Sequence, residues 1–213
     1  MAPKYRLTYF NVKARGETAR LIFAAAGEEY EDNRIEFEDW AALKGEFGPP
    51  DMPGFNTLPV LHVEGKGVIT QSMAINRYLA RQFELAGKSP FESARIDMFA
   101  DGVTDVLNSE HYRKFIMEQE PSKRSEYLSE FLEGEVQTLL ARYEAFLEMN
   151  NGRCLVGEQM TYADLHLFNF LDTLRAFHPP LLADHPLLER LVLKIQDKAN
   201  VKAYIDARPV TPF

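Results

Sequence analysis

Two side chains at the first predicted turn between a strand and a helix could together stabilise an anion. Tyr9 lies near the end of Lys4 to Phe10, a stretch whose alternation and aromatic content predict a strand. Arg15 stands where the next helix is expected to begin. A donating phenol hydroxyl and a nearby guanidinium both favour the charged form of an acidic group. The alternative is an ordinary half-buried strand tyrosine and a solvated helix arginine.

Two further positions could hold carboxylate groups. Ser72 is predicted to cap a helix from Ser72 to Phe83, and a helix N-terminus attracts anions through its free N–H groups and its dipole. Trp40 and Lys44 are four residues apart on a short helix predicted from Asp39 to Phe47, so they should lie on one face. The alternatives are a simple serine cap and surface packing of a Trp–Lys pair.

The second half of the chain carries two more polar patterns. Asp97, Asp101 and Asp105 recur every four residues on one helical face, where like charges repel by roughly 0.2–0.5 kcal/mol per pair. A solvated acidic face is the ordinary explanation for this pattern. Thr161 and Asp164 have the spacing of a capping box before an apolar helical run. We interpret this second motif as structural, with a cap that contributes about 1 kcal/mol.

The elements that must position these residues change in character near residue 85. Before it, the predicted order is strand, helix, strand, helix, strand, strand, helix, which suits a small mixed sheet with helices on its faces. The remaining predicted elements of this part are a helix Glu17–Ala26 stopped by Gly27, a strand Tyr30–Phe37, a loop Gly48–Gly54 and a hairpin of Pro59–Val63 with Val68–Thr70. Beyond it, the sequence predicts only helices, over Asp97–Met117, Ser122–Met149, Tyr162–Phe177 and Leu187–Ala207. We therefore predict a first domain over 1–83, a linker over 84–90 and an all-α domain over 91–213.

Composition limits the classes of function. The 213 residues are 46% hydrophobic and 26% charged, as in an average globular protein, and the net charge of −8 gives no electrostatic reason to bind nucleic acid or an anionic membrane. Cys154 is the only cysteine, so no intrachain disulfide can form, and no cysteine lies at the first turn. The five histidines are scattered, so no metal is expected. With neither a signal-peptide pattern nor a membrane-length apolar run, we expect a cytoplasmic protein.

Several segments together resemble a known family. Tyr9 to Glu17 with Arg20 resembles the opening of sigma-class glutathione transferases. The same resemblance extends, in family order and across most of the chain, to Trp40 with Lys44, Leu58–Leu61, Gln71–Leu79 and Thr161–Asp164. It implies a thioredoxin-like N-terminal domain followed by an all-helical domain, in a homodimer that uses glutathione as co-substrate and conjugates it to hydrophobic electrophiles.

The resemblance also implies roles for single residues. Tyr9 and Arg15 would hold the glutathione thiol as thiolate. A free thiol has a pKa of about 8.5, and lowering it by about two units takes roughly 2.7 kcal/mol. The main chain of Leu58, before a cis Pro59, would pair with the cysteinyl part of glutathione. The rest of the tripeptide would be bound at its γ-glutamyl carboxylate by Gln71 and Ser72, at its glycine carboxylate by Trp40 and Lys44, and at its amine by Asp105 of the partner subunit.

The electrophile pocket implied by the resemblance is apolar and lies beside the sulfur. Its candidate residues are Phe10, Val12, Ala14, Leu107, Tyr112, His166, Phe170 and Phe213. His166 could be a polar handle there, but an isolated helix histidine is more often structural. Phe55 is expected at the dimer contact.

Two alternatives remain open at the level of function. The first is a glutathione-dependent prostaglandin D isomerase, but Tyr112 replaces a pocket tryptophan of those enzymes and Thr104 replaces an acidic residue associated with their divalent metal. The second is a non-catalytic lens S-crystallin or ligand carrier. Against it, the glutathione-site residues are present and the helical domain carries no obvious insertion.

Overall fold

The chain divides by its internal contacts into two units, which are described separately. The computed structural model describes residues 4–51, 54–211 and 213. The first unit comprises Met1–Ala86 together with Ile195–Phe213, and the second comprises Gly87–Lys194. This division differs from the predicted domain boundaries in one respect, because the end of the chain groups with the N-terminal unit. Residues 52 and 53 of the predicted loop Gly48–Gly54 lie outside the described residues, and the rest of that loop forms turns and bends.

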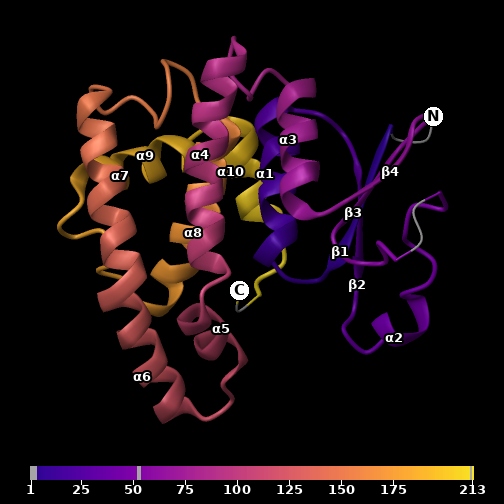
Figure 1. Ribbon diagram of the computed structural model, residues 1–213, viewed down its shortest axis with the longest axis horizontal. Coiled ribbons are helices and arrows are strands. Elements are labelled where there is room, and N and C mark those ends of the chain that lie inside the picture. The colour runs from indigo at the N-terminus through magenta and orange to yellow at the C-terminus, as the bar shows by residue number, and fades with distance from the viewer. Residues whose placement is uncertain (1–3, 52–53, 212) are drawn as a thin grey trace. The chain divides into compact units, whose positions relative to one another are not determined.

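A four-stranded mixed sheet forms the centre of the first unit (Figure 1). Its strands are β1 (Tyr5–Phe10), β2 (Glu31–Ile35), β3 (Val60–Val63) and β4 (Gly67–Thr70), in the order β2-β1-β3-β4. β1 pairs parallel with β2 and antiparallel with β3, which pairs antiparallel with β4. The predicted mixed sheet of the thioredoxin type is confirmed.

The described residues of the first unit also form four helices, besides the end of α9 (Pro186–Gln196). They are α1 (Ala14–Ala26), α2 (Trp40–Leu43), α3 (Ser72–Gln82) and α10 (Ala199–Ala207). α1 and α3 lie side by side on one face of the sheet, and α10 packs against α1 (Figure 1). α1 is buried on nearly all sides, with Leu21, Ile22 and Phe23 fully inaccessible to solvent. Gly27 ends it in the left-handed conformation (φ 68°), as predicted, because a glycine meets no Cβ penalty there.

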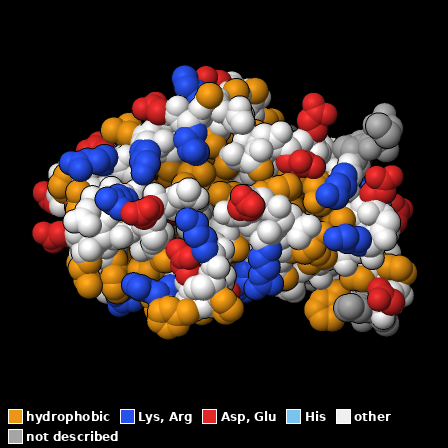
Figure 2. Space-filling model, turned by 90° about the horizontal axis from the view of Figure 1, so that it is seen from above, with side chains coloured by type: hydrophobic (Ala, Val, Ile, Leu, Met, Phe, Trp, Pro, Cys, Tyr) orange, Lys and Arg blue, Asp and Glu red, His pale blue; other side chains and the backbone are white. Residues whose placement is uncertain are grey.

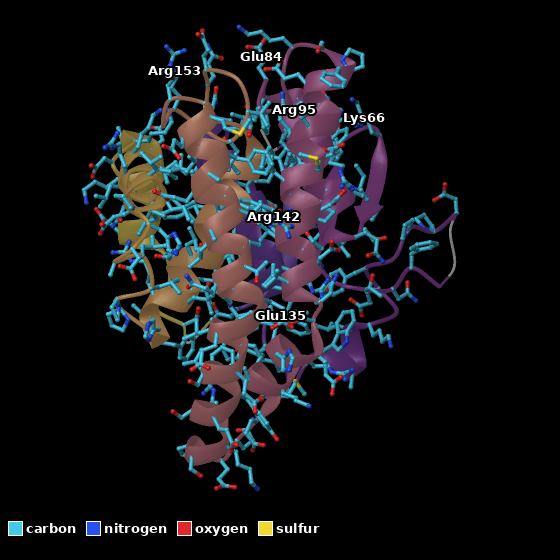
Figure 3. All side chains as sticks on the ribbon, turned by 60° about the vertical axis from the view of Figure 1, so that its left-hand side comes forward. Lys66, Glu84, Arg95, Glu135, Arg142 and Arg153 are labelled. Atoms are coloured by element: carbon cyan, nitrogen blue, oxygen red, sulfur yellow. The ribbon has the colours of Figure 1, made fainter. Side chains whose placement is uncertain are left out.

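The described residues of the second unit form helices and connecting turns only. These helices are α4 (Pro90–Leu107), α5 (Glu110–Met117), α6 (Pro121–Phe131), α7 (Gln137–Met149), α8 (Tyr162–Phe177) and the greater part of α9 (Pro186–Gln196). α8 is the core helix and has the predicted bounds. A π-helical turn, η1 (Leu132–Val136), joins α6 to α7, and its Glu135 is labelled in Figure 3.

Two predicted long helices are each broken in the structure. The stretch Asp97–Met117 stops at Asn108, and Ser109 starts a new helix because its side chain accepts a hydrogen bond from the N–H of Tyr112 (3.1 Å). The stretch Leu187–Ala207 is interrupted between α9 and α10, where Lys198 has an extended backbone. Neither junction contains a glycine or a proline, so no strong helix breaker marks either break in the sequence.

The capping box at the start of α8 is confirmed. The Asp164 carboxylate is completely buried and accepts hydrogen bonds from the Thr161 N–H and hydroxyl, both at 2.8 Å. It also accepts one from the Leu155 N–H at 2.9 Å. One carboxylate therefore fixes both the start of the core helix and the loop that precedes it.

The surface carries mixed charge. Figure 2 shows acidic and basic side chains interspersed on one face of the molecule, among apolar ones. Among the described residues, no three His, Cys, Asp or Glu side chains are arranged to hold a metal ion. Within the same part of the chain, none of the helices is both long enough and apolar enough to cross a membrane.

Candidate active site at one end of the sheet

The strand register brings the predicted site residues to one end of the sheet. Thr8 of β1 is paired with Val60 at the start of β3, and Val60 is paired with Thr70 at the end of β4. The segments that continue from these three points therefore leave the sheet together. They carry Tyr9, Leu58, Gln71 and Ser72. The parallel partner β2 ends opposite Phe10 and leads into α2, which carries Trp40.

The Leu58–Pro59 peptide bond is cis, as the resemblance implied. Pro59 is buried and Leu58 is partly exposed, directly before the first residue of β3. The main chain of Leu58 thus lies beside the end of β1, at the strand edge where an extended peptide could pair with it.

The start of α3 differs from the prediction. Ser72 is the first helical residue, Gln71 occupies the N-cap position, and no side chain caps the helix. The prediction that Ser72 is the cap was therefore wrong by one residue. Gln71 has φ 71° and ψ 114°, a conformation in which residues with a side chain are strained. Both side chains nevertheless stand at the N-terminal end of α3, where the first N–H groups favour an anion.

Tyr9 is packed tightly against the first turn of α1. A Cβ atom built on Gly16 would lie 2.5 Å from Cδ1 of the Tyr9 ring, so only glycine allows this approach. The Arg15 main-chain N–H donates a hydrogen bond to the Tyr9 hydroxyl oxygen (3.3 Å), and the hydroxyl retains its own hydrogen for another acceptor. The phenol therefore stands at the positive end of α1.

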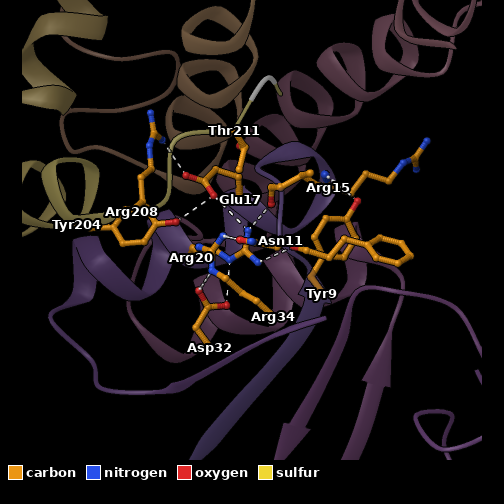
Figure 4. A network of polar contacts seen from close by, with 12 residues as sticks. Tyr9, Asn11, Arg15, Glu17, Arg20, Asp32, Arg34, Tyr204, Arg208 and Thr211 are labelled. Carbon is orange, nitrogen blue, oxygen red and sulfur yellow. Dashed lines mark hydrogen bonds and ion pairs between the residues drawn. The ribbon is translucent and has the colours of Figure 1, made fainter. Parts of the chain in front are cut away.

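The electrostatic setting keeps Tyr9 neutral near pH 7. Burial raises its pKa above the ordinary value of 10.0, while the N–H of Arg15 and the charges of Arg15 and Arg20 act against that rise. A neutral phenol is a hydrogen-bond donor, and two nearby guanidinium groups favour an anion as its acceptor. The Arg15 side chain is exposed and extends away from the buried polar network (Figure 4).

Trp40 belongs to an aromatic group at the ends of β1 and β2. Phe10 stacks on Phe37 with 4.3 Å between ring centroids, and the Trp40 ring meets Phe10 edge-on at 5.8 Å. Lys44 follows one turn later, and its N–H donates to the Trp40 carbonyl (2.9 Å). Trp40 is half-buried in α2 and Lys44, the C-cap of that helix, is exposed, so indole and ammonium remain accessible. The predicted helix Asp39–Phe47 is shorter in the structure, where it ends at Leu43.

A buried network behind this turn was missed by the sequence analysis. The fully buried Arg20 contacts Glu17, Asp32 and the main chain of the turn, and Glu17 contacts Tyr204 and Arg208 of the α10 segment (Figure 4). One signal was available, because Glu17 and Arg20 are charged residues three apart in a helix that is otherwise largely apolar. Their partners lie far away in the sequence and could not be inferred from it.

The predicted electrophile-pocket residues are divided between the two units. Phe10, Val12, Ala14 and Phe213 belong to the first unit, and Leu107, Tyr112, His166 and Phe170 to the second. Within the second unit, Tyr112 lies 5.5 Å from Phe131 between ring centroids, and Phe170 is almost entirely buried beside Phe131. Their contact with a substrate stays a prediction.

The acidic face of α4, formed by Asp97, Asp101 and Asp105, and the adjacent Thr104 differ in their hydrogen bonds and exposure. Asp97 accepts a short hydrogen bond from the Tyr162 hydroxyl, whereas Asp105 is exposed. The Thr104 hydroxyl donates to the Ala100 carbonyl (2.9 Å) and therefore accepts from Nε2 of the buried His166 (3.1 Å). His166 is thus tied to α4.

The fold and the site define a thioredoxin-like domain joined to an all-helical one. Comparison with known proteins agrees: residues 5–81 match the model of the glutathione S-transferase N-terminal domain, and residues 105–208 match that of the C-terminal domain. Glutathione S-transferase 1 of Ascaris suum is 37% identical, covering 99% of this chain and 100% of the relative. The hematopoietic prostaglandin D synthase of Gallus gallus is 34% identical, covering 98% of each.

Solved structures give the same result. The monomeric Na-GST-3 of Necator americanus superposes with a TM-score of 0.87 at 33% identity, over 98% of this chain and 99% of that one. A Nu-class transferase of Haemonchus contortus gives 0.85 at 35% identity, over 98% of each chain. The chain belongs to the glutathione S-transferase family. The predicted transferase fold, enzyme class and co-substrate glutathione are confirmed.

Proposed function

We propose that this chain binds glutathione at the described end of the sheet, ionises its thiol with Tyr9 and Arg15, and transfers the thiolate to hydrophobic electrophiles. One observation carries the proposal. The buried, neutral Tyr9 hydroxyl accepts a hydrogen bond from the first turn of α1 and keeps its own hydrogen for a sulfur.

The energetics are adequate for thiol activation. Lowering a thiol pKa by about two units requires roughly 2.7 kcal/mol of preferential anion stabilisation. One hydrogen bond to a charged acceptor supplies about 1.5–3 kcal/mol, and the N-terminal end of a helix adds about 0.3–1 kcal/mol. The thiol proton leaves to solvent. The sulfur then uses a lone pair to form the bond to the electrophilic carbon, and any leaving group departs with its bonding electrons.

The remaining assignments for glutathione follow the arrangement at the sheet end. Leu58 would pair with the cysteinyl main chain, Gln71 and Ser72 would hold the γ-glutamyl carboxylate, and Trp40 with Lys44 would hold the glycine carboxylate. Asp105 of the partner subunit would contact the amine. The strand register supports the first three roles, because it places these segments beside Tyr9.

Replacing the phenol tests the mechanism. Tyr9→Phe removes one hydrogen-bond donor and little volume, so the thiol pKa of bound glutathione should rise while binding is largely retained. The thiolate absorbance of the complex, followed across pH, measures this pKa. Tyr78→Phe is the matched control, since the Tyr78 hydroxyl contacts Lys66 beside the β3–β4 turn, at the opposite end of the sheet. A titration curve that is identical for Tyr9→Phe and the unaltered chain would remove Tyr9 from the mechanism.

We place the chain in the sigma-type class, as a cytoplasmic homodimer. The likeness to the Gallus gallus prostaglandin D synthase supports the class, whereas the Nu-class neighbour offers the competing assignment. Phe55 is 47% exposed and is proposed as a dimer contact. Phe55→Ala should weaken dimerisation in analytical ultracentrifugation. A monomeric unaltered chain, like the Necator americanus relative, would refute the dimer.

A prostaglandin D isomerase is the second candidate, favoured by the same Gallus gallus relative. The Thr104 hydroxyl weighs against metal activation at that position, because it is engaged with Ala100 and His166. Measuring endoperoxide isomerisation with and without magnesium separates this candidate from a general transferase. Turnover of a chlorinated dinitrobenzene separates both from a non-catalytic carrier.

A further inference from the structure

The turn between Tyr9 and Arg15 is held by a buried guanidinium. Nη1 of Arg20 donates to the Val12 carbonyl (2.6 Å) and Nη2 donates to the Phe10 carbonyl (3.2 Å). Cζ of Arg20 also lies 5.8 Å from the centroid of the Tyr9 ring. Arg20 therefore sets the path of the main chain from the phenol to the start of α1. It also places a positive charge beside the phenol.

This guanidinium depends on two carboxylates. Arg20 has no solvent exposure, and a buried charge is costly unless it is paired and hydrogen-bonded. Its Nε contacts Oδ1 of Asp32 at 3.1 Å, and its Nη1 contacts Oε2 of Glu17 at 3.4 Å. Asp32 lies on β2 and is partly exposed, whereas Glu17 lies on α1 and is as buried as Arg20.

Glu17 in turn is held by the α10 segment near the end of the chain. The Tyr204 hydroxyl donates to its Oε2 (2.9 Å), and Nη1 of Arg208 contacts its Oε1 (2.7 Å). The buried carboxylate is therefore shared between two guanidinium groups and a phenol, as Figure 4 shows. A second link runs from the same segment to the turn itself, since the Lys13 N–H donates to the oxygen of Phe213 (2.9 Å).

We propose that Tyr204 and Arg208 are positioning residues for thiol activation. By fixing Glu17 they fix the orientation of Arg20, and through Arg20 they fix the turn that carries Tyr9 and Arg15. This inference rests on the proposed function, because it assumes that those two residues act on the glutathione thiol. Neither Tyr204 nor Arg208 needs to touch glutathione to exert this effect.

Removing the distant guanidinium should disturb the chemistry more than the fold. In Arg208→Met, Glu17 loses one of its two cationic partners and draws Arg20 away from the Phe10 and Val12 carbonyls. A misplacement of about 1 Å at a reacting group can cost about 100-fold in rate, so we expect kcat/KM to fall by about 10-fold or more. The thiol pKa of bound glutathione should rise toward the free value of about 8.5.

Graded variants separate positioning from stability. Tyr204→Phe removes a single hydrogen bond and should raise the thiol pKa less than Arg208→Met does. Arg208→Lys keeps the charge and should restore most of the activity. Lys202→Met is the matched control, because it removes an exposed ion pair with Asp206 in the same helix (3.1 Å). This control should leave both kcat/KM and the thiol titration unchanged.

The outcomes distinguish this inference from the proposed function. If Tyr204→Phe folds, melts at a lower temperature and keeps the unaltered thiol pKa and kcat, the network is structural only and the inference is overturned. Where Arg208→Met folds, an unaltered thiol pKa and kcat in that variant overturn the inference as well. If Tyr9→Phe itself leaves the thiol pKa unchanged, the proposed function fails first. If Tyr9→Phe, Tyr204→Phe and Arg208→Met all raise this pKa, both the proposed function and the inference stand.

Discussion

Gly16 offers a direct way to move Tyr9 without changing its chemistry. In Gly16→Ala the new Cβ would stand 2.5 Å from Cδ1 and 2.7 Å from Cγ of the Tyr9 ring. Ordinary contact begins at 3.4 Å, so the ring must retreat by about 0.9 Å. The clashing atoms belong to the base of a buried ring and not to a flexible chain end. The hydroxyl is therefore carried away from its place at the first turn of α1.

Two effects on stability oppose each other in this variant. Forcing a methyl group into a packed site costs about 1–3 kcal/mol, whereas alanine in place of a helical glycine gains about 1 kcal/mol. We expect a net loss of about 0–2 kcal/mol in the free energy of unfolding. The effect on rate should be larger, since a shift of about 1 Å at a reacting group can reduce it by about 100-fold.

The assay combines denaturant unfolding with steady-state kinetics and the thiolate titration. Gly134→Ala is the control, because a Cβ there meets no atom of the described residues within 4 Å, and its backbone is helical. That variant should keep full activity and gain up to about 1 kcal/mol. If Gly16→Ala retained the unaltered kcat/KM and thiol pKa, the position of the Tyr9 ring would not govern catalysis.

Three other predictions concern the second unit. Glu144→Ala removes the carboxylate that accepts hydrogen bonds from the Leu187 and Leu188 N–H groups (2.8 and 2.9 Å). The free energy of unfolding, measured in urea, should therefore fall by about 1–2 kcal/mol. Glu148→Ala, at an exposed position of the same helix, is the control and should leave this free energy unchanged. The hydrogen bond to Glu135 raises the pKa of His111 above 6.5, so its stabilisation is present below that pH and is lost as the pH rises through the higher folded-state value. The melting temperature should therefore fall more steeply between about pH 6 and about pH 8 in the unaltered chain than in His111→Gln, and parallel curves would contradict this. Burial raises the pKa of Cys154 to about 11, which makes its thiolate fraction about 300-fold smaller than that of a thiol with a pKa of about 8.5, so alkylation should be slow until the protein is unfolded.

Local patterns predicted the local features of the fold. The alternation of Lys4 to Phe10, the glycine stop at Gly27 and the capping box of Thr161 with Asp164 each depend on neighbours within a few residues, and each is present in the structure. The start of α3 was misplaced because Ser72 is a common cap, whereas the positive φ of Gln71 leaves no signature in its residue type.

Contacts between residues far apart in the chain could not be predicted from the sequence. Glu17 and Arg208 are 191 residues apart, and neither neighbourhood shows that the other exists. The same holds for the pairing of β1 with β2 and β3, which gathers the predicted glutathione residues at one end of the sheet. The residue types were enough to suggest candidates for a glutathione site. Only the strand register shows that the segments carrying these candidates leave the sheet at the same end.

The grouping of α10 with the N-terminal unit has a consequence for biosynthesis. A ribosome releases a chain from its N-terminus at about 5–20 residues per second, and domains commonly fold as they emerge. Here the sheet and α1 are synthesised first, but Glu17 meets Tyr204 and Arg208 only after the whole helical unit has been translated. Until then a nascent chain must keep this carboxylate hydrated. The first unit to be made is therefore the last to be completed.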